Sequence, residues 1–158
     1  MSDILEPLQR IEGYVLRDQL GFKLSRAARV AQRRLEADLA QEGMTRLTWC
    51  VLSSVGLEGI TTPSGVADNL GVARPVLSRL IKAMVADGLL QTQLAHGDGR
   101  NRTLSLTAQG EQKLAACMPH AEANALHFRS KFTADQLAVL HGLLETLVDG
   151  EQGALDTL

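Results

Sequence analysis

The stretch from Thr62 to Thr107, TPSGVADNLGVARPVLSRLIKAMVADGLLQTQLAHGDGRNRTLSLT, decides the fold of this chain. Thr62 followed by Pro63 predicts a helix start, because the hydroxyl can cap the first turn and proline lacks an N–H that would have no partner there. Gly71 ends this short helix, and a second helix begins a few residues later near Ala73. Two helices joined by so tight a turn form a helix-turn-helix.

The second helix has an apolar face and a basic face. At about 100° per residue, one arc holds Val76, Leu77, Leu80, Ile81 and Met84. The opposite arc holds Arg74, Ser78, Arg79 and Lys82. Such a helix can pack on a core and present basic and hydroxyl side chains to the major groove of DNA. Periodicity alone equally allows an ordinary helix with a solvated face.

A β-hairpin is predicted to follow. Residues 89–94 read as one strand and residues 102–106 as its partner, joined by an exposed turn with two glycines and Arg100 at its tip. A hairpin directly after a helix-turn-helix makes a winged helix, and Arg100 is placed to enter a minor groove, where the negative potential is strongest. A solubilising charge is the alternative for Arg100. Residues 60–62 are β-branched, and we expect them to form a third strand beside this wing.

Taken in order, these features resemble the multiple-antibiotic-resistance regulator (MarR) family of bacterial transcription factors. The matching features are the T-x-x-x-W of Thr45 and Trp49, the run GITTPSGVADNLG at 59–71, residues 80–90, the D-x-R of Asp98 and Arg100, and the L-T-x-x-G at 106–110. The resemblance extends over about residues 16–149 in length and element order. It implies a homodimer whose two recognition helices read a pseudo-palindromic double-stranded DNA operator with half-sites about one helical turn apart.

The resemblance also implies which residues contact DNA. Residues 74–82 would read bases and phosphates, Arg100 would enter the minor groove, and Asp98 would help to hold the wing. The candidate DNA-binding residues are Thr62, Ser64, Arg74, Pro75, Ser78, Arg79, Lys82, Asp98, Arg100 and Arg102. The chain departs from the family where the strand entering the wing commonly carries arginine, since Thr92 and Gln93 stand there. We therefore expect a shallower salt dependence, by about one unit of slope for each lost phosphate contact.

The flanking segments predict long helices. Apolar residues recur at helical spacing from Asp18 to Gly43, and Thr133 caps a last helix over Ala134–Val148 with a leucine stripe. The expected fold is mainly α with a small β wing (α+β), in one domain over 1–158. It has a winged helix-turn-helix at about 45–107, dimerisation helices at about 16–44 and 108–149, and a flexible tail at 150–158. Because a winged helix can bury its own core, a second copy is the economical partner for the terminal stripes.

Composition agrees with a helical, DNA-facing protein. The chain has 158 residues, 45% of them hydrophobic, and a net charge of −2. The charge is unevenly distributed: residues 62–107 carry five basic against three acidic residues, and residues 17–34 carry six basic residues against Asp18. The acidic N-terminus lacks an apolar run, so we expect a cytoplasmic protein without a membrane segment.

Catalysis is not indicated. There is no G-x-S-x-G, no P-loop and no His/Cys pair at metal spacing, so we expect no enzyme, no metal and no cofactor. Cys50 and Cys117 lie in helical patterns, and redox sensing is not favoured for them.

The resemblance to the MarR family also implies an effector, because most members respond to small molecules, often aromatic or phenolic acids. Candidate ligand-binding residues are Arg17 and Arg26 as anion partners, with Phe22 and Trp49 as an apolar wall. A solvated face or a phosphate contact is the simpler interpretation of the arginines. The sequence thus favours a homodimeric transcriptional repressor released by a small ligand. The alternative is a winged helix that only binds other proteins, which Thr92, Gln93 and the acidic total support.

Overall fold

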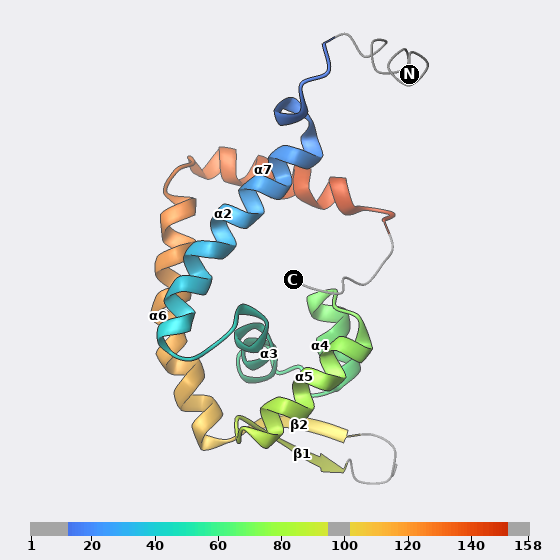
Figure 1. Cartoon of the computed structure of the whole chain (residues 1–158), viewed down its shortest axis with the longest axis vertical. Coiled ribbons are helices and arrows are strands. Elements are labelled where there is room, and N and C mark those ends of the chain that lie inside the picture. Colours follow the sequence, from blue (N-terminus) through green and yellow to red (C-terminus); the bar gives the residue numbers. More distant parts are fainter. Residues whose placement is uncertain (1–12, 95–101, 152–158) are drawn as a thin grey trace, which may run out of the picture. The chain divides into compact units, whose positions relative to one another are not determined.

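The structure, a computed structural model, describes residues 13–94 and 102–151 (Figure 1). Within these residues the elements are a 3-10 turn η1 (Leu16–Asp18), six α-helices and one hairpin: α2 (Leu20–Gln41), α3 (Arg46–Gly56), α4 (Pro63–Leu70), α5 (Arg74–Ala86), β1 (Leu90–Leu94), β2 (Arg102–Leu106), α6 (Ala108–Arg129) and α7 (Ala134–Val148). The chain divides into two compact units, one ending at Arg33 and one beginning at Arg34. The predicted fold class is confirmed, whereas the tail beyond Glu151 lies outside the described residues.

Threonine caps begin four of these helices. The hydroxyls of Thr45, Thr62, Thr107 and Thr133 each accept a hydrogen bond from a backbone N–H in the first turn of α3, α4, α6 and α7, respectively. At Thr133 the cap is reciprocal, because the side chain of Gln136 accepts from the Thr133 N–H. These caps explain why the predicted bounds of α7 agree with the observed ones.

Gly71 makes the turn between α4 and α5. Its φ of 64° lies in the left-handed region that favours glycine, and the next N–H, that of Val72, donates to the carbonyl of Ala67 at 3.0 Å. This bond closes α4, and Val72 is itself only 1% exposed. The chain can therefore reverse into α5 after a few residues, as the sequence predicted.

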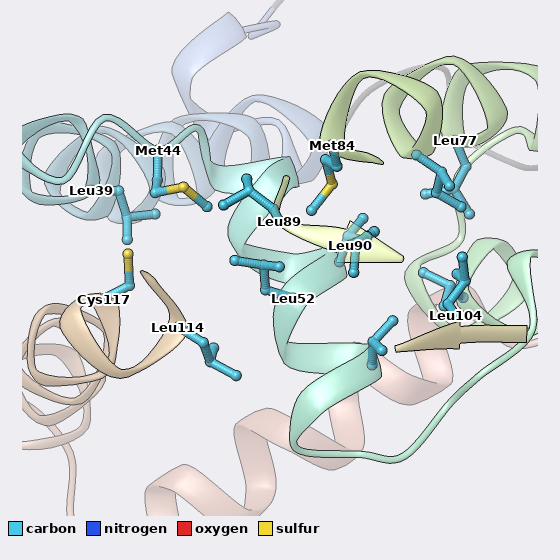
Figure 2. Close-up of a cluster of buried hydrophobic side chains, with 14 of the residues drawn as sticks. Leu39, Met44, Leu52, Leu77, Met84, Leu89, Leu90, Leu104, Leu114 and Cys117 are labelled. Atoms are coloured by element: carbon cyan, nitrogen blue, oxygen red, sulfur yellow. The ribbon is translucent and has the colours of Figure 1, made fainter. Parts of the chain in front are cut away.

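The core lies around α3, which contacts α4, α6 and β2, while α5 packs on β1. Its largest fully buried side chains include Leu52 of α3, Leu77 and Met84 of α5, Leu90 of β1 and Leu104 of β2. Leu39 of α2 and Cys117 of α6, both 0% exposed, point toward each other in Figure 2. A single apolar cluster thus connects the helix-turn-helix and the wing strands to α6.

The wing sheet has two strands in the described residues, not three. β1 and β2 are antiparallel, with Leu90 opposite Leu106 and Thr92 opposite Leu104. The predicted strand at 60–62 is wrong: this segment makes one ladder-like bond, from the Leu104 N–H to the Thr61 carbonyl at 2.7 Å. The pairing stops there because Thr62 is the cap of α4 and Pro63 has no N–H to donate.

Candidate nucleic-acid interface

Helix α5 is anchored by one face and free on the other. Leu77, Ile81 and Met84 are buried, and Val76 and Leu80 are half-buried. Pro75 occupies the first turn, where its missing N–H costs no helix hydrogen bond. The predicted core face is therefore confirmed, and the opposite face is held outward by packing.

All eight candidate DNA-binding residues within the described part of the chain are exposed. They are Thr62, Ser64, Arg74, Pro75, Ser78, Arg79, Lys82 and Arg102. They come from the start of α4, from α5 and from the first residue of β2. Asp98 and Arg100 lie outside the described residues, so their predicted roles stay predictions.

The cations of α5 are only loosely engaged. A nitrogen of the Arg74 guanidinium lies 3.5 Å from Asp68 Oδ1, with both side chains about two-thirds exposed, and such pairs contribute at most about 1 kcal/mol. Arg79 Nε donates to the Pro75 carbonyl at 3.4 Å. Lys82 forms no ion pair within the described residues. A phosphate or a base edge could therefore replace these contacts at little cost.

A polar bridge, which the sequence did not reveal, holds α4 on α3. Asn69 Nδ2 donates to Ser54 Oγ at 3.1 Å and to Glu58 Oε2 at 2.9 Å. Ser54 is the only polar side chain among the buried residues described, and this bond gives its oxygen a donor. The bridge positions α4, and through Gly71 the start of α5. In the sequence, the only indication of this bridge was an asparagine in the last turn of a short helix.

A second group of polar atoms is buried without hydrogen-bond partners. Three of the residues, Arg46, Trp49 and Ser53, share one side of α3. Each of them, like Asn124 of α6, has at least one buried nitrogen or oxygen without a hydrogen-bond partner. Arg46 Nε lies 3.6 Å from Glu36 Oε1, too far for a hydrogen bond. Buried polar atoms usually have hydrogen-bond partners, so a polar ligand that supplied the missing partners could bind here.

The predicted ligand residues fall in different units. Arg17 and Arg26 are exposed and Phe22 is half-buried in the first unit, whereas Trp49 is half-buried in the second. Of the four described residues with buried polar atoms that lack hydrogen-bond partners, Trp49 is predicted from the sequence as a candidate ligand residue, whereas Arg46, Ser53 and Asn124 are not. Their spacing on α3 could have indicated Arg46 and Ser53, whereas Asn124 lies more than seventy residues away in the chain.

The thiols are poorly suited to redox chemistry. Burial raises the pKa of Cys50, an effect that Arg46 partly offsets, and burial also raises the pKa of Cys117. Both groups therefore favour the neutral thiol over the reactive thiolate. The described residues contain no group of three or more potential metal ligands. None of their helices is both long and apolar enough to cross a membrane.

Comparison with known proteins identifies related sequences and folds. Residues 42–101 match the model of the MarR family. A mutant of MarR from E. coli complexed with operator DNA is 22% identical, with a TM-score of 0.76, over 85% of this chain and 99% of that one. No curated protein sequence gives a significant match.

Two further solved structures share the fold. The PcaV transcriptional regulator from Streptomyces coelicolor, in complex with its natural ligand, is 20% identical with a TM-score of 0.78, over 88% of this chain and 98% of that one. BpsR from Bordetella bronchiseptica, whose DNA binding is regulated by 6-hydroxynicotinic acid, is 19% identical with a TM-score of 0.78, over 87% and 99%. At such identities the likeness establishes the fold.

Proposed function

We propose that the protein is a sequence-specific DNA-binding transcriptional regulator rather than an enzyme, on the premise that residues 42–101 match the model of the MarR family. The observation that carries the proposal is the α5 face. Arg74, Ser78, Arg79 and Lys82 are all exposed on a helix whose other side is fixed in the core. Arginine and lysine on such a helix can reach guanine edges and phosphates in a major groove. The wing, with Asp98 and Arg100, would add the minor-groove contact.

The regulator is proposed to act as a homodimer on a pseudo-palindromic operator. No residue of α7 is buried, and Val139, Leu143 and Val148 are each more than 60% exposed. A helix with so much exposed apolar surface is typical of an interface. Twofold pairing of the terminal helices would bury this surface and present two recognition helices at once.

The dimer proposal predicts the effect of a charge on α7. Leu143→Glu is expected to produce monomers, because two carboxylates would be buried across a twofold interface without partners. Leu143 is 63% exposed in the single chain, so the protomer should remain folded. Sedimentation velocity measures the mass, and Glu145→Gln on the exposed surface is the control. A dimer that survives Leu143→Glu would exclude α7 from the interface.

We further propose that the regulator is a cytoplasmic repressor released by a small molecule with acidic or phenolic groups. The buried nitrogens of Arg46 and Trp49 that lack hydrogen-bond partners support this effector class, since an acid or phenol oxygen would accept their hydrogen bonds. The dependence of BpsR on 6-hydroxynicotinic acid is a parallel in a protein of the same fold. The predicted ligand roles of Arg17, Phe22 and Arg26, which lie in the first unit, stay predictions.

DNA titration tests the proposal directly. A fluorescent duplex from the region upstream of the protein's own gene is compared with a scrambled duplex at two salt concentrations. The proposal expects tighter binding to the former and a steep loss of affinity with salt. If neither this duplex nor a selection from random sequences yields specific binding, the winged helix is a protein-binding module instead.

A further inference from the structure

A cavity of about 540 Å³ lies where α3, β2 and α6 meet, entirely within the second unit. This is within the usual range for small-molecule sites, about 300–1,000 Å³. Most of its lining is apolar, and its larger side chains are Leu57, Leu104, Leu106, Leu114 and Met118. The cavity does not include Arg46, Trp49, Ser53 or Asn124, so it is separate from the group of unpartnered polar atoms.

One side of the cavity is tightly packed. Gly56 ends α3 at this point, and a Cβ there would stand 2.6 Å from Leu106 Cδ1 and 2.8 Å from Leu114 Cδ2. The backbone of α3 thus passes directly against both leucines. Because this side of the cavity is closely packed, we expect its wall to keep its shape when a ligand binds.

Glu111 is the single charged residue among the lining residues that the structure describes. It has no ion-pair partner within the described residues, and it lies in the first turn of α6. The other lining residues with polar side chains are Thr61 and Ser105. An apolar cavity with one carboxylate at its edge attracts a cation with a hydrophobic body and repels acids.

The cavity also touches two parts of the DNA-binding region. Thr61 and Leu104 both line it, and the Leu104 N–H donates to the Thr61 carbonyl at 2.7 Å. Thr61 immediately precedes the cap of α4, and Leu104 is in the middle of wing strand β2. A ligand here would contact the junction at which the helix-turn-helix and the wing are joined.

From these observations we propose that the cavity binds a small hydrophobic cation, such as an arylalkylamine, and that occupation changes the affinity for DNA. The binding part of this proposal stands on the cavity alone, and the regulatory part rests on the proposed DNA-binding function. The ligand class is opposite in charge to the acidic effector proposed for the α3 face.

Calorimetric titration of the full chain with naphthylethylamine and naphthylpropionate tests the binding part. The two probes share a ring system and differ in charge, so the amine should bind at least about tenfold more tightly. Glu111→Gln should lower amine affinity about fivefold, the upper range for an exposed ion pair. Glu122→Gln, the same change at an exposed position of α6 outside the lining, should leave it unchanged.

A variant that fills the cavity tests whether the amine binds there. Ala115 lines the cavity and is itself exposed, so Ala115→Phe should fill the space and abolish amine binding without disturbing the core. If this variant fails to fold by circular dichroism, Leu57→Ala replaces it, because Leu57 lines the cavity and is 58% exposed. Absence of amine binding, equal affinity for both probes, or unchanged affinity in Glu111→Gln would overturn the binding part.

Fluorescence anisotropy with a specific duplex tests the regulatory part. The amine should shift the Kd for DNA at least about threefold in the unmodified protein, and by much less in Glu111→Gln at the same amine concentration. Calorimetric binding with an unchanged Kd for DNA overturns regulation and leaves the site. If the protein binds no specific DNA sequence, the proposed function is wrong. The calorimetric test of amine binding does not depend on DNA and stays valid in that case.

Discussion

Replacing Gly110 with alanine is expected to destabilise the protein by about 3 kcal/mol or more, the range of severe core substitutions. Gly110 is buried in the first turn of α6, where its N–H donates to the Thr107 hydroxyl at 3.0 Å. A Cβ there would stand well inside 3.0 Å of the Leu89 carbonyl oxygen. That oxygen belongs to backbone that is itself held, since it accepts a bond from the Thr107 N–H. Either α6 or the start of β1 must move.

The control for this variant is another helical glycine. Gly142 of α7 has no atom within 4 Å of the position that a Cβ would occupy, so Gly142→Ala should stabilise α7 by up to about 1 kcal/mol through helix propensity. Urea unfolding of both variants measures the difference. If Gly110→Ala unfolds at the midpoint of the unmodified protein, the close approach of α6 to Leu89 is not present in solution.

Replacing Arg74, Arg79 and Lys82 together with alanine is expected to reduce specific DNA affinity by about a hundredfold or more. Each good contact to a base contributes about 1–3 kcal/mol, and a tenfold change corresponds to about 1.4 kcal/mol. The slope of log affinity against log salt should become shallower by about two to three units if these cations meet phosphates. Fluorescence anisotropy at several salt concentrations gives both quantities. Arg79→Ala alone should relax base preference.

The α5 variant should remain folded, because all three side chains are exposed and change stability by about 0.5 kcal/mol or less. A matched control separates local contacts from overall charge: Arg129→Ala with Lys131→Ala removes two exposed cations near the end of α6. This control should retain affinity and slope. Equal losses in both variants would mean that α5 attracts DNA only as part of a general positive field, and would remove it as the recognition helix.

Local sequence signals predicted most of the helices. The predicted hydroxyl caps at Thr62 and Thr133 are bonds within one helical turn, so the residues that make them are neighbours in the chain. The two faces of α5 follow equally from local geometry, because a helix places every residue at about 100° from the last. The winged helix could therefore be predicted from residues that are close together in the sequence.

The third strand and the polar bridges could not be predicted in this way. Whether residues 60–62 pair with β2 depends on how many bonds the ladder can complete, and this segment makes one such bond before Thr62 caps α4. The bridge from Asn69 to Ser54 and Glu58 joins two helices, and its partners lie more than ten residues apart. Propensity and periodicity carry no information about which distant polar groups will meet.

The sequence by itself determined the order of elements, the helix ends and the basic face of α5, because these depend on interactions between residues close together in the chain. Only the tertiary structure decided that Gly110 must lack a side chain, that nitrogens of Arg46 and Trp49 are buried without hydrogen-bond partners, and that Glu111 stands at an apolar cavity. Each of these depends on which segments pack against one another. That choice is made by the core as a whole, where close packing leaves room for one arrangement of many side chains at once.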